Sequence, residues 1–102
     1  MQLPGGVIQL SAPLLWLDEL PDGRILATTL FYKDTPDEQT NAFVYDSTGT
    51  METEIRIEDN GRLVRILGSE VENGEITILG ANDTKYTLDP VGWAVTRARY
   101  YR

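Results

Sequence analysis

The chain has 102 residues, of which 41% are hydrophobic and 25% are charged, as in an ordinary soluble globular domain. It contains no cysteine and no histidine, which excludes disulfide scaffolds, zinc sites with those ligands, cysteine nucleophiles and Ser-His-Asp catalysis. The net charge is −7, and residues 34–59, with eight acidic residues and one arginine, account for all of it. We therefore expect no binding to nucleic acid, and either a solvated acidic surface or one that docks a basic partner.

The N-terminal part of the chain shows no sign of secretion or membrane insertion. Its longest apolar stretch, residues 7–20, is interrupted by polar residues and a proline and is shorter than the roughly 18 apolar residues of a membrane helix. No basic residue precedes this stretch, as a signal peptide would require. We therefore expect a cytoplasmic protein that has no contact with a membrane.

The predicted elements are short β-strands. Residues 14–20 have helical spacing, but Pro13 and Pro21 bracket only seven residues, which is short for a helix. Residues 24–32 are apolar on both faces and are expected to run through the interior. Elsewhere, short apolar runs alternate with turns, which is typical of an all-β meander. The other strands are expected at residues 7–10, 42–45, 51–57, 63–67, 75–79, 84–88 and 93–101.

Strand 51–57 has the clearest alternation of apolar and charged residues. One face is predicted to be buried and carries Met51, Thr53, Ile55 and Ile57. The other is predicted to face solvent and carries Glu52, Glu54, Arg56 and Glu58. This pattern predicts a half-buried antiparallel strand with a charged outer face.

Turn signals separate the strands. Asp22-Gly23, Asn60-Gly61 and Asn73-Gly74 supply the residues that two-residue hairpins need at positive φ. Ala81-Asn82-Asp83 and Asp89-Pro90-Val91-Gly92 suit longer turns. Strands joined in this way are antiparallel neighbours, and the hairpin at Asn60-Gly61 is expected to join two units of the fold directly.

An internal repeat groups these strands into two units. Residues 46–57 and 89–100 share an Asp, a Gly, a Thr and an Arg at matching positions. We predict a single domain, residues 1–102, built from two four-strand units at about 12–57 and 63–101, because one such unit rarely buries its apolar face alone. The first copy is eight residues longer, and the polar loop 33–40 fits this difference.

The repeat resembles a known type of blade. Residues 20–30 (LPDGRILATTL) and 44–57 (VYDSTGTMETEIRI) look like the blades of NHL-type β-propellers. Residues 45–49 (YDSTG), followed by 59–63 (DNGRL), are also similar to the YD repeats of Rhs-type shell proteins, although the turn glycines here have no regular period. Two blades do not close a propeller, so the resemblance implies assembly with other copies, a fragment, or two packed sheets. The alternative to an antiparallel meander of eight or nine strands is a curled up-and-down barrel or a sandwich.

No motif in the sequence predicts catalysis, a cofactor or a metal. The polar loop 33–40, which is acidic, lacks the spacing of a calcium site. The two tryptophans, Trp16 and Trp93, are expected to anchor the core. Candidate residues for binding a partner lie in the acidic loop, in strand 51–57 and in the C-terminal strand: Asp34, Asp37, Glu38, Glu52, Glu54, Arg97, Arg99, Tyr100 and Tyr101. The C-terminal strand is expected to be an edge strand, open to pairing.

The two units carry opposite charges at equivalent positions, because Glu54 corresponds to Arg97 in the overlay of the repeats. We expect the basic strand either to pair with the acidic face within one molecule or to act head to tail between copies. The sequence therefore favours a non-enzymatic all-β module that recognises a protein partner and self-associates. Two alternatives stay open: a small acidic inhibitor or immunity-type protein that masks a basic surface, and a barrel that holds a small ligand.

Overall fold

The computed structural model describes residues 2–3, 6–7, 10, 12–31 and 38–100, and every regular element in it is a β-strand. Eight strands form two four-stranded antiparallel sheets, and two further hairpins make small sheets of their own. The expected all-β antiparallel meander is confirmed. Within the described residues, neither large sheet closes into a barrel, and no helix is long and apolar enough to cross a membrane.

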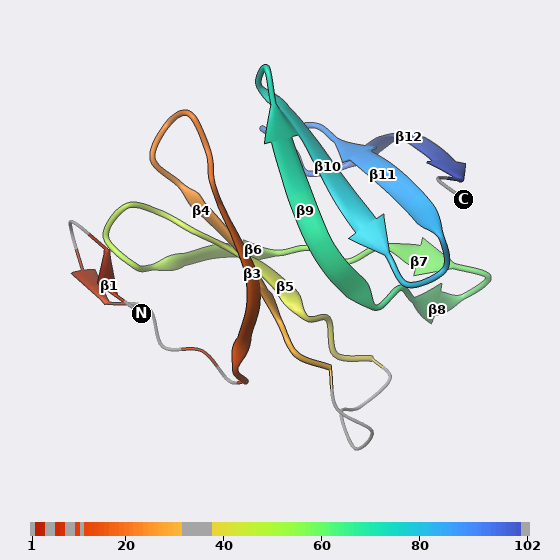
Figure 1. Cartoon of the computed structure of the whole chain (residues 1–102), viewed down its shortest axis with the longest axis horizontal. Coiled ribbons are helices and arrows are strands. Elements are labelled where there is room, and N and C mark those ends of the chain that lie inside the picture. The colour runs from red at the N-terminus through yellow and green to blue at the C-terminus, as the bar shows by residue number, and fades with distance from the viewer. Residues whose placement is uncertain (1, 4–5, 8–9, 11, 32–37, 101–102) are drawn as a thin grey trace.

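Each large sheet is a meander in which strands adjacent in sequence pair with each other (Figure 1). The first sheet contains β3 (Leu14–Glu19), β4 (Ile25–Thr29), β5 (Ala42–Tyr45) and β6 (Met51–Glu54), in that order. The second contains β9 (Ile66–Glu72), β10 (Glu75–Gly80), β11 (Thr84–Leu88) and β12 (Val95–Tyr100). The small hairpins are β1 (Gln2–Leu3) with β2 (Gly6–Val7), and β7 (Glu58–Asp59) with β8 (Arg62–Leu63).

Two of the tight turns have the conformation that their sequences predict. Asn60 and Gly61 have φ values of 53° and 78°, and Asn73 and Gly74 have 52° and 79°. Two consecutive positive φ values are the signature of a type I′ hairpin, which matches the right-handed twist of the flanking strands. These turns close the β7–β8 and β9–β10 hairpins.

The two copies of the repeat differ in their Asp-x-x-Gly turns. In the first, the amide of Gly49 donates to the carbonyl of Asp46 at 3.1 Å, and Gly49 has a φ of 92°. In the second, the corresponding bond to the Asp89 carbonyl comes from Trp93, at 2.8 Å, and Trp93 has a φ of 62°. The second turn is therefore one residue longer, and Gly92 is not the structural counterpart of Gly49.

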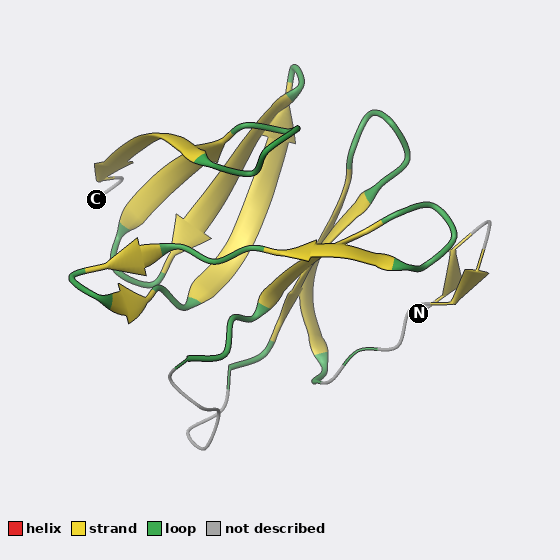
Figure 2. Cartoon of the chain, turned by 180° about the vertical axis from the view of Figure 1, so that it is seen from behind, coloured by secondary structure: helices red, strands yellow, loops and turns green. Residues whose placement is uncertain are grey.

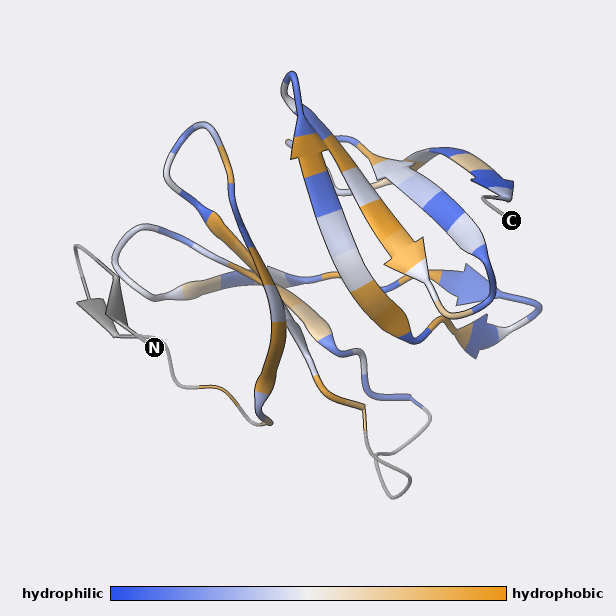
Figure 3. Ribbon diagram, viewed as in Figure 1, coloured by the Kyte–Doolittle hydropathy of each residue, from blue (hydrophilic) through white to orange (hydrophobic). Residues whose placement is uncertain are grey.

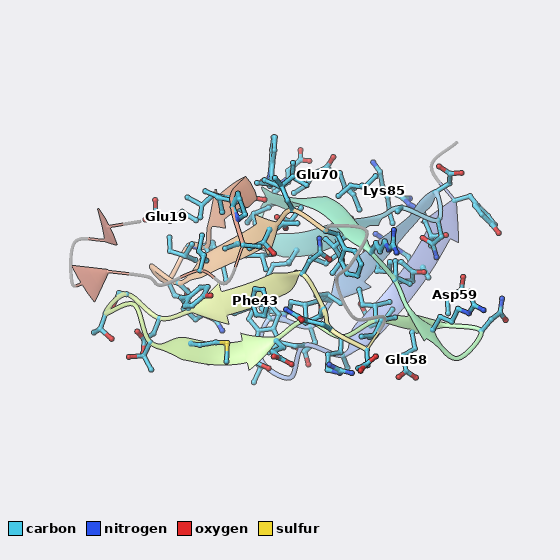
Figure 4. The ribbon with its side chains drawn as sticks, turned by 90° about the horizontal axis from the view of Figure 1, so that it is seen from below. Glu19, Phe43, Glu58, Asp59, Glu70 and Lys85 are labelled. Atoms are coloured by element: carbon cyan, nitrogen blue, oxygen red, sulfur yellow. The ribbon has the colours of Figure 1, made fainter. Side chains whose placement is uncertain are left out.

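One hydrophobic core lies between the two large sheets, and both supply its side chains. Its most deeply buried members, at most 1% exposed, are Leu26, Ala42, Val44 and Ile55 from the first unit and Ile66, Ile76 and Ile78 from the second. All of β4 is buried, as predicted for the strand apolar on both faces. On the opposite side of the first sheet, Leu10 packs against a second buried cluster formed by Ile25, Ala27, Phe43 and Tyr45, of which Figure 4 labels Phe43.

The alternation predicted for strand 51–57 holds only in its second half. The isoleucines are buried as predicted, but Met51 is half exposed. The reason is a β-bulge: Thr53 pairs with Val44, whereas Met51 pairs with Tyr45, so the register shifts by one residue. Because successive side chains alternate between faces, this extra residue turns Met51 away from the core.

The β7–β8 hairpin connects the last strand of the first large sheet to the first strand of the second (Figure 2). The expected direct junction at Asn60-Gly61 is wrong, because β8 pairs only with β7 and the hairpin forms a separate two-stranded sheet. The chain then enters β9, which packs against β3 and β4. The second sheet therefore packs against the first sheet mainly through β9, which contacts β3 and β4.

Candidate interaction surfaces

Large apolar side chains are exposed where the first strands of the two sheets meet. Leu14, Leu15, Trp16 and Leu17 of β3 are 41%, 42%, 50% and 38% exposed, and Leu67 of β9 is 51% exposed. β3 and β9 pack against each other, and the hydrophobic parts of both strands are visible in Figure 3. We call these five residues the apolar strip.

The apolar strip is exposed because β3 is an edge strand with a bulge. Leu14 pairs with Thr29 and Trp16 with Thr28, so Leu15 has no partner in β4. The sequence reads as a core segment, but an edge strand has a neighbour on one side only, and the bulge turns side chains out of the regular alternation. The expectation that Trp16 anchors the core is therefore wrong.

Trp16 is nevertheless held in a defined position. Its Nε1 donates to Asp18 Oδ2 at 3.0 Å, and Ser69 Oγ of the second sheet donates to the same oxygen. A Cβ atom built on Gly68 would lie 3.5 Å from Trp16 Cγ, so the indole lies on the glycine backbone of β9. An ordered, half-exposed tryptophan is a typical anchor of a protein–protein contact.

The last strand, β12, is a free edge exposed in all six residues. It carries the predicted site residues Arg97, Arg99 and Tyr100. The expected pairing of this strand with the acidic face of the first unit is wrong, because β12 pairs with β11 and Arg97 Nη2 lies 3.3 Å from Glu75 Oε1 of its own sheet. A second ion pair, between Glu70 and Lys85 at 3.9 Å, lies on the same face of this sheet as Arg97 and Glu75. Glu70 and Lys85 are labelled in Figure 4.

The structure does not bring the predicted acidic residues together. Glu54 lies on the edge strand β6, 3.6 Å from Arg56, and Glu52 lies 3.3 Å from Arg24 of the turn between β3 and β4. Glu38 is exposed at the end of the polar loop. The remaining predicted residues, Asp34, Asp37 and Tyr101, lie outside the described residues. No group of carboxylates among those described is arranged to hold a metal ion.

Arg24 connects the two units, and sequence reasoning missed it. Its guanidinium lies 2.7 Å from Asp22 and 3.3 Å from Glu52, donates to the carbonyl of Pro90 at 3.1 Å, and lies 5.1 Å from the ring centre of Trp93. The hydrogen bond from Arg24 lowers the pKa of the Asp22 carboxyl. Pro90 and Trp93 belong to the turn between β11 and β12, so Arg24 ties this turn to the first sheet.

We expect Arg24→Ala to lower the free energy of unfolding by about 1–2 kcal/mol, because the Trp93 ring and the Pro90 carbonyl lose their partner. Arg56→Ala is the matched control, since its exposed ion pair with Glu54 is worth roughly 0–1 kcal/mol. Urea denaturation followed by tryptophan fluorescence measures both. Equal losses in the two variants would show that Arg24 does not tie the units together.

A half-open groove of about 590 Å³ lies beside the β7–β8 hairpin. Its wall balances three arginines against three acids: Arg56, Arg62, Arg65, Glu38, Glu58 and Asp59, the last two labelled in Figure 4. Arg65 lies 4.4 Å from the ring centre of Phe31. With charges of both signs in equal number, the groove selects neither an anion nor a cation.

No protein-family model, curated protein or solved structure matches this chain. The resemblances of its turns to propeller blades and to YD repeats therefore stay predictions. Five of the nine large hydrophobic side chains that are exposed in the described part of the chain belong to the apolar strip.

Proposed function

We propose that this chain is a non-enzymatic, β-rich module that binds a protein partner and associates with copies of itself. The apolar strip carries this proposal, because its five large apolar side chains are exposed on two strands that pack against each other. Exposed apolar side chains that form a patch larger than a few hundred Å² commonly mark a protein–protein contact. Covering it removes apolar surface from water, which is the main driving force of association.

The edge position of β3 supports a protein as the partner. An edge strand presents unpaired backbone N–H and C=O groups, and an added strand from another chain can satisfy them. The added strand would bind β3 through backbone hydrogen bonds, and side chains of the partner would cover the apolar strip.

A cytoplasmic location also remains a prediction.

The two alternatives receive less support from the described residues. An acidic inhibitor would concentrate its carboxylates on one surface, but Glu52 and Glu54 each lie beside an arginine of the same chain. A ligand-binding barrel needs an enclosed interior, whereas both large sheets are open. A contact dominated by apolar side chains fits the exposed surface better.

The proposal is tested by the mass of the protein in solution. We expect association that grows with protein concentration and persists in roughly 0.5 M salt, where interactions between exposed charges are screened. Leu15→Gln combined with Leu17→Gln should weaken it at least about tenfold, because each leucine loses on the order of 1.5 kcal/mol of burial. Sedimentation velocity measures this shift.

Val91→Gln is the matched control, because Val91 is 85% exposed but stands alone in the turn after β11. This variant should associate as the wild type does. A monomer at every concentration in both low and high salt would overturn the proposal. Self-association that disappears in high salt would show that charged surfaces, and not the apolar strip, carry the contact.

A further inference from the structure

The outer edges of the two sheets carry opposite charges. β6 ends the first sheet and carries Glu52 and Glu54, whereas β12 ends the second and carries Arg97 and Arg99. Among the described residues, each strand is paired on one side only, so each presents a row of backbone donors and acceptors along its outer edge. The two edges belong to different sheets and do not pair within the molecule.

We propose that β12 of one copy adds to β6 of the next copy as an antiparallel strand, which joins two four-stranded sheets into one sheet of eight. The partner is a second copy of this chain because it supplies the complementary edge. This inference rests on the proposed self-association, but it uses a surface separate from the apolar strip and adds an electrostatic contact to it.

Burial and pairing select one register. Thr53 lies on the side of β6 that faces the core, because it pairs with Val44. Ala98 lies on the same side of β12, because it pairs with Tyr86. Aligning Thr53 with Ala98 places their neighbours, Glu54 and Arg97, opposite each other on the outer face. A shift by one residue would place core-facing side chains opposite outward-facing ones.

The charges that this register places opposite each other are complementary, and the ion pairs already present within the chain do not prevent the contact. Glu54–Arg56 at 3.6 Å and Arg97–Glu75 at 3.3 Å join side chains that are each about half exposed. Such surface pairs contribute roughly 0–1 kcal/mol, so their members can exchange partners readily. Opposite charges directly across a pair of strands stabilise it, whereas like charges destabilise it.

A contact of this kind is heterologous, since each copy uses its acidic edge once and its basic edge once. Repetition of the contact closes into a ring if the rotation allows it and otherwise continues as a fibre. Because exposed charges guide it, it weakens as salt rises. The salt-resistant contact through the apolar strip and the salt-sensitive contact through the edges are therefore separable.

Charge reversal tests the inference directly. Glu54→Arg and Arg97→Glu each place like charges across the contact, so each variant alone should lose the extra growth in mass that the wild type shows in roughly 0.05 M salt compared with roughly 0.5 M salt. An equimolar mixture should regain that growth, because the two reversed edges complement each other. Light scattering measures the mass, and circular dichroism shows that each variant is folded. Extra growth in low salt in the single variants, or none in a mixture of folded variants, would overturn the inference.

Cysteine pairs test the register, since the chain has no cysteine of its own. A mixture of Thr53→Cys with Ala98→Cys should form disulfide-linked dimers at least about tenfold faster than Thr53→Cys with Tyr100→Cys, because only the first pair lies directly opposite. Equal rates would overturn the edge contact. If the rates are equal but association persists in high salt, the proposed function stands without the edge contact. If the disulfide forms at the faster rate but association in high salt is absent, only the role of the apolar strip fails.

Discussion

Replacing Asn41 with leucine is expected to lower the free energy of unfolding by about 3–5 kcal/mol, because several buried polar groups would lose their partners at once. Asn41 is 2% exposed. Its Nδ2 donates to the carbonyls of Thr29 at 2.9 Å and Ile66 at 2.7 Å, and its Oδ1 accepts from the amide of Ile66 at 2.9 Å. The side chain thus joins the first sheet to the start of β9.

Leucine has the same branched arrangement of four side-chain heavy atoms as asparagine but no polar atom, so it leaves no cavity and the loss reports hydrogen bonds. Each buried donor or acceptor left without a partner costs about 1–3 kcal/mol, and a domain is stable by only about 5–15 kcal/mol. Urea denaturation measures the change. Gln39→Leu, at an exposed position two residues earlier, is the control and should stay within about 0.5 kcal/mol of the wild type. A similar result for Asn41→Leu would contradict this account.

Gly80→Ala is expected to destabilise the protein by about 2–3 kcal/mol through overpacking. A Cβ atom at this position would lie 2.8 Å from Val64 Cγ1 and 2.5 Å from Asn82 Oδ1. Val64 is part of the core between the sheets. Asn82 donates to Asp59 of the β7–β8 hairpin at 3.1 Å and to the hydroxyl of Tyr86 at 2.7 Å, so moving Asn82 away would also loosen the hairpin.

Gly68→Ala is the matched control for Gly80→Ala. The atoms nearest to a Cβ atom at Gly68 belong to Trp16, at 3.5–3.8 Å, which is ordinary van der Waals contact. We expect little change in the melting temperature for Gly68→Ala and a fall of several degrees for Gly80→Ala. Equal melting temperatures would show that the chain accommodates the added methyl group at Gly80.

The parts of the fold that depend on neighbouring residues can be predicted from the sequence. The Asn-Gly pairs at 60–61 and 73–74 adopt the positive φ values that this dipeptide favours, and the apolar run that contains β4 is buried. The bulge that exposes Met51 has no such local signal. It depends on how β5 and β6 pair, and the alternation of residues in β6 alone reads as a regular strand.

The candidate site is harder to predict because it depends on contacts between distant residues. The exposure of β12 follows from its terminal place in the meander, and this much can be expected from the sequence. Leu14 to Leu17 read as core residues, but they are exposed because β3 is an edge strand and pairs with β4 through a bulge. Arg24 reads as an ordinary turn residue until its contacts with Pro90 and Trp93 are seen.

The contacts that join the two sheets also bear on the order in which the chain folds. They link residues 25 positions apart at Asn41 and Ile66, 51 apart at Asp18 and Ser69, and 66 apart at Arg24 and Pro90. Within each sheet, every hairpin closes a much shorter loop, and the entropy lost on closing a loop rises with its length. We therefore expect the two meanders to form first, their docking to follow, and the contact between Arg24 and the last turn to be the final one made.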